Sequence, residues 1–331
     1  MKKVAWVGNA FFFPHFLRLG FEGAHIRLAE PMALTWQELC SRAGFEPDMV
    51  VYADTSLPPP LVGLERWPSL NVFYAIDTHI HAWYPFYAQA FDLAAVSLKG
   101  HMWRFEARLT TEELLWLPPA AQDQHQPDWE AEKEWDILFA GSVDQLTTPK
   151  RYEFLRELGS LVDGLVVKKG KFAELFPRAR LSLNIAERGD LNFRVFEALA
   201  CGACLVTPEV KHGFSDLFEN GCHLFTYDPR DMDGLVRLLQ GLLKSPQRCH
   251  KVAQAGHALV HQKHRFANRA LALRDFVASR PVDALIEKRR AMAEVIRETF
   301  LKEILLHNAD RYKEVSLGER YLRAALGKAG E

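Results

Sequence analysis

The first hundred residues alternate short apolar runs with segments of helical spacing or loop composition. Short apolar runs bounded by turn residues predict buried strands, and strands separated by helix-length segments predict a parallel sheet covered by helices. The pattern therefore predicts a first α/β domain over residues 1–117. We expect its strands at Lys3–Val7, Ala24–Leu28, Asp48–Tyr52, Asn71–Ile76 and Phe91–Val96, with a helix at Thr35–Arg42.

A proline-rich, polar stretch with few residues to bury follows from Leu117. This composition is typical of an interdomain linker, which we place at residues 118–134. The alternation of strands and helices then restarts and predicts a second α/β domain over residues 135–280. Its expected strands are Asp136–Ala140, Gly164–Val167, Leu181–Ile185, Cys204–Thr207 and His223–Tyr227, and its expected helices are Arg151–Leu158, Phe193–Ala200 and Asp233–Leu243.

The pattern after Pro246 is helical nearly to the end of the sequence. Apolar residues there recur at steps of seven and four, at Leu285, Met292, Ile296, Phe300 and Ile304. This spacing predicts one apolar face of a single long helix. We expect a helical tail over residues 281–331.

Composition and charge narrow the class of protein. Of the 331 residues, 48% are apolar and 25% are charged, which is typical of a globular chain and excludes disorder. The 41 basic and 42 acidic residues nearly balance, so charge gives no reason to expect a nucleic acid or membrane surface as partner. No apolar run approaches the ~18 residues of a membrane span. Five cysteines, an odd number in a large chain, fit a reducing compartment, so we expect a cytoplasmic protein, most readily an enzyme.

The segment Leu181–Thr207 carries the most information about function. A predicted strand ends near Ala186, a polar loop follows, and Asp190 or Asn192 can cap the next helix, which Gly202 ends. In open parallel sheets, ligands bind beyond the carboxyl ends of the strands, where helix N-termini present N–H groups to anions. This loop and helix start are therefore a candidate anion site.

Arg194 and Glu197 lie three residues apart in this helix and project to one face. An arginine beside a helix N-terminus suits a diphosphate, and a carboxylate one turn deeper suits two adjacent ribose hydroxyls. The same spacing is also that of an ordinary surface ion pair, and the spacing alone does not decide between the two.

The run from Asn192 to Thr207 resembles the nucleotide-sugar site of GT-B glycosyltransferases. It is most similar to the group 1, CgeB-like (spore maturation protein-like) set, with its Arg-x-x-Glu-Ala-x-Ala-Cys-Gly signature, and the likeness covers roughly Asp136–Phe276. The resemblance implies an α/β GT-B fold: two Rossmann-like domains facing a cleft, the nucleotide mainly on the second, and a tail that packs back on the first. It also implies a hexosyltransferase-like enzyme that moves a sugar from a nucleotide sugar to an acceptor hydroxyl.

The resemblance assigns roles to individual residues. Glu197 would hold the nucleotide ribose and Arg194 would meet the diphosphate, while Asn192 belongs to the same motif. Gly141 would allow close backbone approach, and Arg151 is a second phosphate candidate. Enzymes of this fold need no bound metal, so we expect no cofactor beyond the nucleotide-sugar donor, and a glycan, protein or small molecule as acceptor.

One departure from the related family 4 enzymes affects the expected chemistry. Those enzymes carry a paired Glu-x₇-Glu, and the position eight before Glu197 is Gly189. Glu187 or Asp190 could substitute from the same loop. A catalytically degenerate protein that only binds nucleotide sugars is therefore an alternative.

A second candidate site, Asp77-Thr-His79-Ile-His81, directly follows a predicted strand of the first domain. Asp77 or His79 could act as the general base on an acceptor hydroxyl. Asp-x-His-x-His also resembles the metal-binding entry of amidohydrolases, which would make the protein a metal-dependent hydrolase with His79 and His81 as ligands. The motif follows the fourth strand rather than the first, and the strands of an eight-fold barrel are missing downstream, which disfavours that alternative. Surface histidines at a strand–helix junction are the third interpretation.

The pair Cys201-Gly-Ala-Cys204 follows a predicted helix instead of preceding one. The helix dipole disfavours a thiolate at that end, so we expect two small buried residues packed on the sheet, and not a redox pair.

Overall fold

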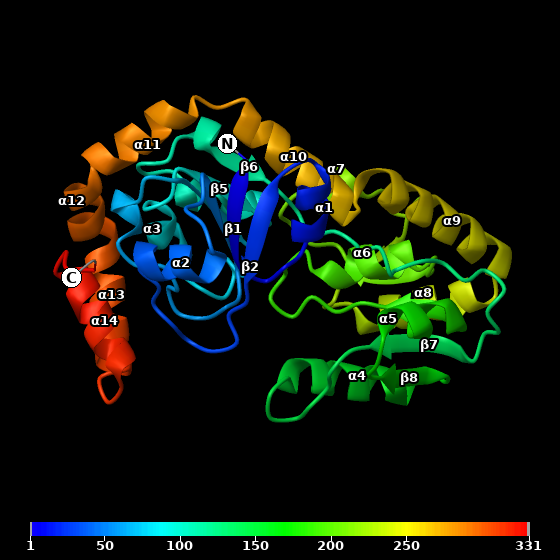
Figure 1. Cartoon of the computed structure of the whole chain (residues 1–331). Coiled ribbons are helices and arrows are strands. Elements are labelled where there is room, and N and C mark those ends of the chain that lie inside the picture. The colour runs from blue at the N-terminus through cyan, green and yellow to red at the C-terminus, as the bar shows by residue number, and fades with distance from the viewer. Residues whose placement is uncertain (1, 330–331) are drawn as a thin grey trace. The chain divides into compact units, whose positions relative to one another are not determined.

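The structure is a computed structural model that describes residues 2–329, and the chain packs into two compact units. Unit 1 comprises the residues up to Pro118 and those from Arg269 onward, and unit 2 comprises Pro119–Asn268. Each unit has its own parallel sheet and its own helices (Figure 1). The predicted domain limits at residues 117, 134 and 280 stay predictions.

The sheet of unit 1 has six parallel strands in the order β2-β1-β3-β4-β5-β6. The central strands β3 and β4 are buried along their whole length, as expected of continuous apolar runs covered on both faces. All five predicted strands are present, and β6 is additional, because three residues are too few to show a pattern. The strands are β1 (Lys3–Gly8), β2 (Glu22–Ile26), β3 (Met49–Ala53), β4 (Leu70–Ala75), β5 (Leu93–Val96) and β6 (Leu114–Trp116).

Helices of unit 1 come from both ends of the chain. Both ends of helix α2 are set by local sequence signals. Thr35 and Glu38 form a capping box at its start, and Gly44 ends it in the left-handed conformation. The helices are α1 (Phe13–Arg18), α2 (Trp36–Ala43), α3 (Tyr84–Ala88), α11 (Val282–Ala291), α12 (Ala293–Ile296), α13 (Lys302–Arg311) and α14 (Ser316–Ala325), with 3₁₀ turns η1 (Leu64–Arg66), η2 (Lys99–Phe105) and η3 (Thr111–Glu113). Helix α10 (Phe266–Ala278) contains the sequence limit between the units.

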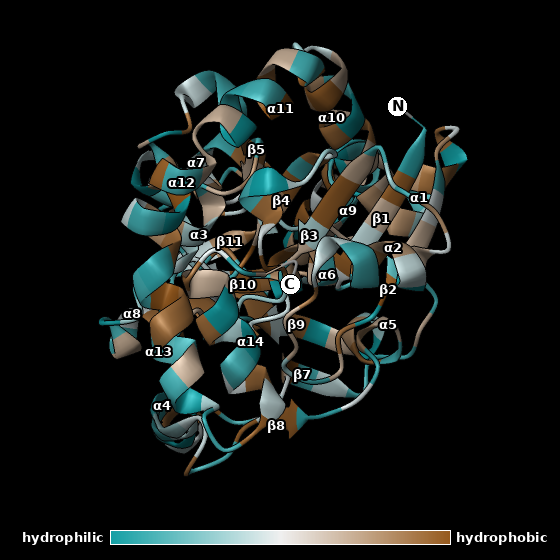
Figure 2. Cartoon of the chain, turned by 60° about the vertical axis from the view of Figure 1, so that its left-hand side comes forward, coloured by the Kyte–Doolittle hydropathy of each residue, from teal (hydrophilic) through white to brown (hydrophobic). Residues whose placement is uncertain are grey.

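The tail is not the single long helix that the spacing predicts. It breaks after α11 and again at a π-helical segment, η5 (Arg297–Leu301). A π turn contains one extra residue, so Leu301 and Leu305 become the residues buried with the sheet of unit 1. Ile304 packs on the same core only in part, and Phe300 does not belong to it. Figure 1 shows these orange and red helices beside the blue and cyan elements of unit 1, and Figure 2 shows α11 and α13 banded brown and teal, as amphipathic helices are.

The sheet of unit 2 has five parallel strands in the order β11-β10-β9-β7-β8. Because all strands run the same way, their carboxyl ends share one edge, where the candidate anion site was predicted. The strands are β7 (Trp135–Ala140), β8 (Leu165–Lys168), β9 (Ala179–Leu183), β10 (Leu205–Pro208) and β11 (Phe225–Tyr227). The helices are α4 (Pro149–Leu161), α5 (Phe172–Leu175), α6 (Phe193–Ala200), α7 (Phe214–Leu217), α8 (Met232–Leu243) and α9 (Pro246–Lys263), with the 3₁₀ turn η4 (Phe176–Arg178).

The proline-rich stretch that follows Leu117, predicted to have few residues to bury, packs against other segments of unit 2. Ala121 and His125 are buried, and the backbone N–H of Ala121 donates to the carbonyl of His264 over 2.9 Å. The guanidinium of Arg265 donates to the Gln122 carbonyl over 3.0 Å. The expectation of an unburied stretch was wrong here, because small residues between the prolines can pack and hydrogen-bond even where no periodic pattern exists.

Within residues 2–329, no helix has both the length and the apolar character needed to cross a membrane.

Candidate functional site

The carboxyl edge of the unit 2 sheet brings Gly141 and Arg194 together. Gly141 directly follows β7, and Arg194 lies in the first turn of α6. A Cβ atom at Gly141 would lie 2.8 Å from Nη2 of Arg194 and 3.2 Å from the Phe139 ring. Glycine therefore lets this backbone turn lie directly against the guanidinium.

The guanidinium of Arg194 is buried but not fully used. Nη1 donates to Oδ1 of Asn184 over 3.2 Å, and the guanidinium lies 5.1 Å from the centroid of the Phe139 ring. Its Nε is buried without a hydrogen-bond partner. Burial lowers the pKa of Arg194, and the nearby charge of Arg151 lowers it further. A buried charged donor with a spare N–H is an expected feature of a site that receives an anion.

Arg151 also lies near the Phe139 ring, with its guanidinium 5.7 Å from the ring centroid. Its Nε lies 2.6 Å from Oε1 of Glu187, and its Nη1 donates to the Ser142 carbonyl over 2.8 Å. Two guanidinium groups near one ring bring two positive charges together, and the carboxylate of Glu187 offsets one of them. Glu187 is thus held in an ion pair with Arg151.

Glu197 is not in the surface ion pair that the spacing allows. Its side chain is only 12% exposed, and its Oε1 lies 3.9 Å from Nε2 of His125. That distance is too long for a hydrogen bond. Burial raises the pKa of Glu197 to about 7, only partly opposed by the charge of Arg194. Burial, assisted by Arg265, lowers the pKa of His125 to about 4, so this histidine is neutral at pH 7.

Asn192 occupies the N-cap position of α6 without forming the cap bond. Its Nδ2 donates to the Ile185 carbonyl over 3.4 Å, whereas its Oδ1 is buried without a partner. No side chain hydrogen-bonds to the start of this helix from the N-cap. The predicted cap position is correct and the predicted bond is wrong. Gly202 ends the helix at φ +71°, in the left-handed conformation that was expected.

Four residues of this site escaped the sequence analysis. Asn184 is a buried polar residue directly after β9, and this could have been noticed. Phe139 looks like any other core residue in the sequence, and His125 and Arg265 come from segments with no strand or helix-start signal. Only the fold places His125 beside Glu197 and Arg265 beside His125.

In unit 1, the second candidate site follows β4 as predicted. Asp77 accepts a hydrogen bond from the Ser56 hydroxyl, and its carbonyl accepts from the backbone N–H of His81 over 3.0 Å, which closes a turn. His79 is half-buried, and its Nδ1 has no hydrogen-bond partner. Within residues 2–329, no three His, Cys, Asp or Glu side chains are grouped to hold a metal ion.

The two cysteines of the Cys-x-x-Cys pair are buried packing residues, as predicted. Cys201 and Cys204 are 1% and 5% exposed, and both are free thiols. Burial raises the pKa of Cys201 to about 12, so a thiolate is disfavoured there.

Comparison with known proteins supports the class suggested by the site. Residues 128–275 match a family model described as glycosyl transferase-like. A search of curated proteins finds no match. The narrower likeness to the CgeB-like set stays a prediction.

Solved GT-B glycosyltransferases share the fold of the chain. Sucrose-phosphate synthase from Thermosynechococcus elongatus aligns with a TM-score of 0.59 at 9% identity, over 84% of this chain and 98% of its own. A glycosyltransferase from Rickettsia africae gives 0.58 at 9% identity, over 84% and 98%. Anabaena HepE, solved with UDP and glucose, gives 0.57 at 11% identity, over 85% and 100%. The predicted fold class of two Rossmann-like, parallel-sheet domains is confirmed.

Proposed function

We propose that the protein is a glycosyltransferase that moves a hexosyl group from a nucleoside-diphosphate sugar to an acceptor hydroxyl without a bound metal ion, as a member of the CgeB-like set. The observation that carries the proposal is the buried Arg194 with its unpartnered Nε, held against Gly141 and one turn from Glu197. The family match over residues 128–275 and the solved complex of HepE with UDP and glucose support it.

Each residue then has a chemical role. The Glu197 carboxylate accepts hydrogen bonds from the ribose hydroxyls, and Arg194, Arg151 and the start of α6 hold the diphosphate. As the bond between the sugar carbon and the phosphate oxygen breaks, the nucleoside diphosphate leaves with the electron pair, and the two arginines stabilise its growing charge. The acceptor oxygen forms the new bond to the sugar carbon, and its proton passes to Asp77 or His79.

The ion pair of Glu187 with Arg151 favours a second candidate function, in which the protein binds nucleotide sugars without transferring the sugar. Gly189 stands where the related enzymes have their first glutamate, and Glu187 is engaged with Arg151. Under this alternative, donor binding would be retained and neither transfer nor slow donor hydrolysis would occur.

A thermal-shift screen against UDP, GDP, TDP, CMP and their common sugar conjugates, with and without EDTA, tests the proposed function. A ligand present at ~100 times its Kd adds about 2.7 kcal/mol to the free energy of unfolding, so the midpoint should rise clearly. We expect one base to be preferred, the shift to persist in EDTA, and the matching phosphate-free nucleoside to give a much smaller shift. No shift with any nucleotide, together with loss of stability in EDTA, would instead support a metal enzyme.

The affinity for the nucleotide sugar should depend on the charge of Glu197. Since its pKa is about 7, the carboxylate is mostly protonated at pH 6 and mostly ionised at pH 8. We expect affinity to rise by up to about tenfold from pH 6 to pH 8, because only the ionised form has both oxygens free to accept ribose hydroxyls. Calorimetric titration with the preferred nucleotide sugar measures this, because its diphosphate does not titrate in this range.

The matched control is Glu197→Gln, which should bind with little dependence on pH. His125 does not interfere, because its pKa of about 4 keeps it neutral throughout. If the glutamine variant showed the same rise as the natural protein, the titrating group would be another one.

A further inference from the structure

A pocket of about 740 Å³ lies within unit 1 and has no role in the site described in unit 2. Four segments line it: the loop after β2 at Pro31, the loop after β3, the stretch from β4 into α3, and the tail from η5 along α13 to Tyr312. Its volume is within the ~300–1,000 Å³ typical of small-molecule sites. Three of the four segments follow carboxyl ends of strands, the edge at which ligands bind in such sheets.

Aromatic rings form one side of the pocket. Phe86 remains 52% exposed although it belongs to a short helix that is otherwise mostly buried. Trp83 is held in place by Tyr84 and Tyr87, with ring centroids 4.6 and 5.4 Å away. Phe300 lines the same pocket. It lies in the π-helical segment, whose extra chain keeps it out of the core. Open rings on rigid supports suit a flat, partly apolar ligand.

Polar side chains form the other side as a regular row. Glu303, His307 and Arg311 lie four residues apart on α13 and all line the pocket. Side chains at this spacing are neighbours on one helix face. The row offers a carboxylate that accepts hydrogen bonds, a guanidinium that donates them, and an imidazole that can do either.

The pocket is connected to the candidate general base through Ser56. Ser56 lines it, and the Ser56 hydroxyl donates to the Asp77 carboxylate. Ser56 has a φ of +56°, which is strained for a residue with a side chain. Asp54 fixes this turn, because it accepts from the backbone N–H groups of Ser56 and Asp77 over 2.8 and 2.7 Å and from the Tyr84 hydroxyl. The strained turn is thus locked to the loop that carries Asp77.

We propose that this pocket is the acceptor site and that the acceptor is a pyranoside. A pyranose ring has C–H faces that pack on aromatic rings and a rim of hydroxyls that both donate and accept, which matches the two sides of the pocket. A purely aliphatic acceptor would bury Glu303 and Arg311 without partners. The inference rests on the proposed function, because the sugar bound in this pocket would be the acceptor and would receive the transferred group at a hydroxyl near Asp77.

Saturation-transfer NMR on the full chain tests the inference with the methyl glycosides of glucose, galactose, mannose and N-acetylglucosamine as probes. We expect at least one glycoside to receive saturation. Phe300→Ala and Glu303→Gln should each weaken its binding by about tenfold, as loss of one stacking or hydrogen-bonding partner does. Leu306→Ala is the matched control, because Leu306 is an exposed α13 residue that does not line the pocket, and its variant should bind as the natural protein does.

The nucleotide thermal shift, measured on the same samples, separates this inference from the proposed function. It should be equal in all three variants and also shows that each variant is folded. A nucleotide shift without saturation of any glycoside, or with glycoside binding unchanged in both Phe300→Ala and Glu303→Gln, would overturn the acceptor assignment while leaving the donor site intact. Glycoside binding lost in both variants, in a protein that binds no nucleotide, would support the sugar pocket and overturn the transferase.

Discussion

Replacing Arg194 by alanine should lower turnover of the nucleotide sugar by about 100-fold or more in a protein that still folds. The Nε of this guanidinium is buried and has no hydrogen-bond partner in the protein. A charge held in place before the reaction stabilises the leaving diphosphate without reorganisation, which is why its loss acts mainly on kcat. Steady-state release of the nucleoside diphosphate measures the effect.

Two further variants make this result specific. Arg194→Lys keeps a positive charge but loses the planar fork, so it should fall between alanine and the natural protein. Arg237→Ala removes an exposed arginine from α8 in the same unit and should leave turnover unchanged. Unchanged turnover in a folded Arg194→Ala protein would remove this residue from the mechanism.

The local chemistry of the unit 2 site could be predicted because it depends on residues close together in sequence. Helical spacing fixes the separation of Arg194 and Glu197, and Gly202 marks the end of the helix that carries both. What the spacing does not contain is the environment. Glu197 has a raised pKa because of burial, and burial depends on neighbours such as His125, more than seventy residues away in a stretch without any pattern.

The strands were predictable for a similar reason, whereas the tail was not. A buried parallel strand is a continuous apolar run, and β3 and β4 show this directly in sequence. In the tail, Phe300 and Leu301 are both apolar, so the sequence fits either an unbroken α-helix or one with a π turn. Packing on the sheet selects Leu301 for the core, and Phe300 is left to line the pocket.

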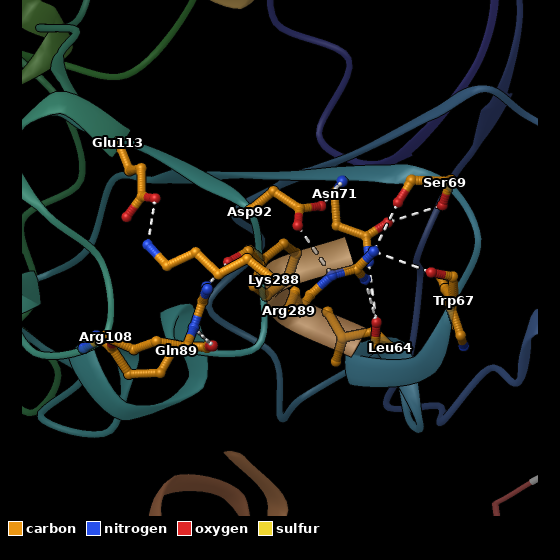
Figure 3. A network of polar contacts seen from close by, with 11 residues as sticks. Leu64, Trp67, Ser69, Asn71, Gln89, Asp92, Arg108, Glu113, Lys288 and Arg289 are labelled. Carbon is orange, nitrogen blue, oxygen red and sulfur yellow. Dashed lines mark hydrogen bonds and ion pairs between the residues drawn. The ribbon is translucent and has the colours of Figure 1, made fainter. Parts of the chain in front are cut away.

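The tail is joined to the unit 1 sheet by a buried ion pair that has no sequence signal. Arg289 of α11 is fully buried, and its Nε lies 3.0 Å from Oδ1 of Asp92, just before β5. Figure 3 shows the guanidinium at the centre of the network, where it also donates to the carbonyls of Leu64, Trp67 and Ser69. All these partners are more than 190 residues away in sequence.

Replacing Arg289 by alanine should therefore lower the free energy of unfolding by about 3–5 kcal/mol, as removal of one partner of a buried ion pair does. The loss arises because Asp92 and three carbonyls would stay buried with fewer donors, and α11 would lose its polar attachment to the sheet. Chemical denaturation followed by tryptophan fluorescence measures it. Arg290→Ala, which removes the exposed neighbouring arginine, should change the free energy by less than about 0.5 kcal/mol.

The double variant Arg289→Ala/Asp92→Asn tests whether the unpaired charge of Asp92 causes most of the loss in the free energy of unfolding. The asparagine oxygen can still accept the 2.7 Å hydrogen bond from the Asn71 N–H, and it carries no charge that needs Arg289. The double variant should therefore be more stable than Arg289→Ala alone, even though it carries one more substitution. If the two losses simply added, the guanidinium would act through its contacts with the carbonyls, and the ion pair would contribute little to holding the tail on the sheet.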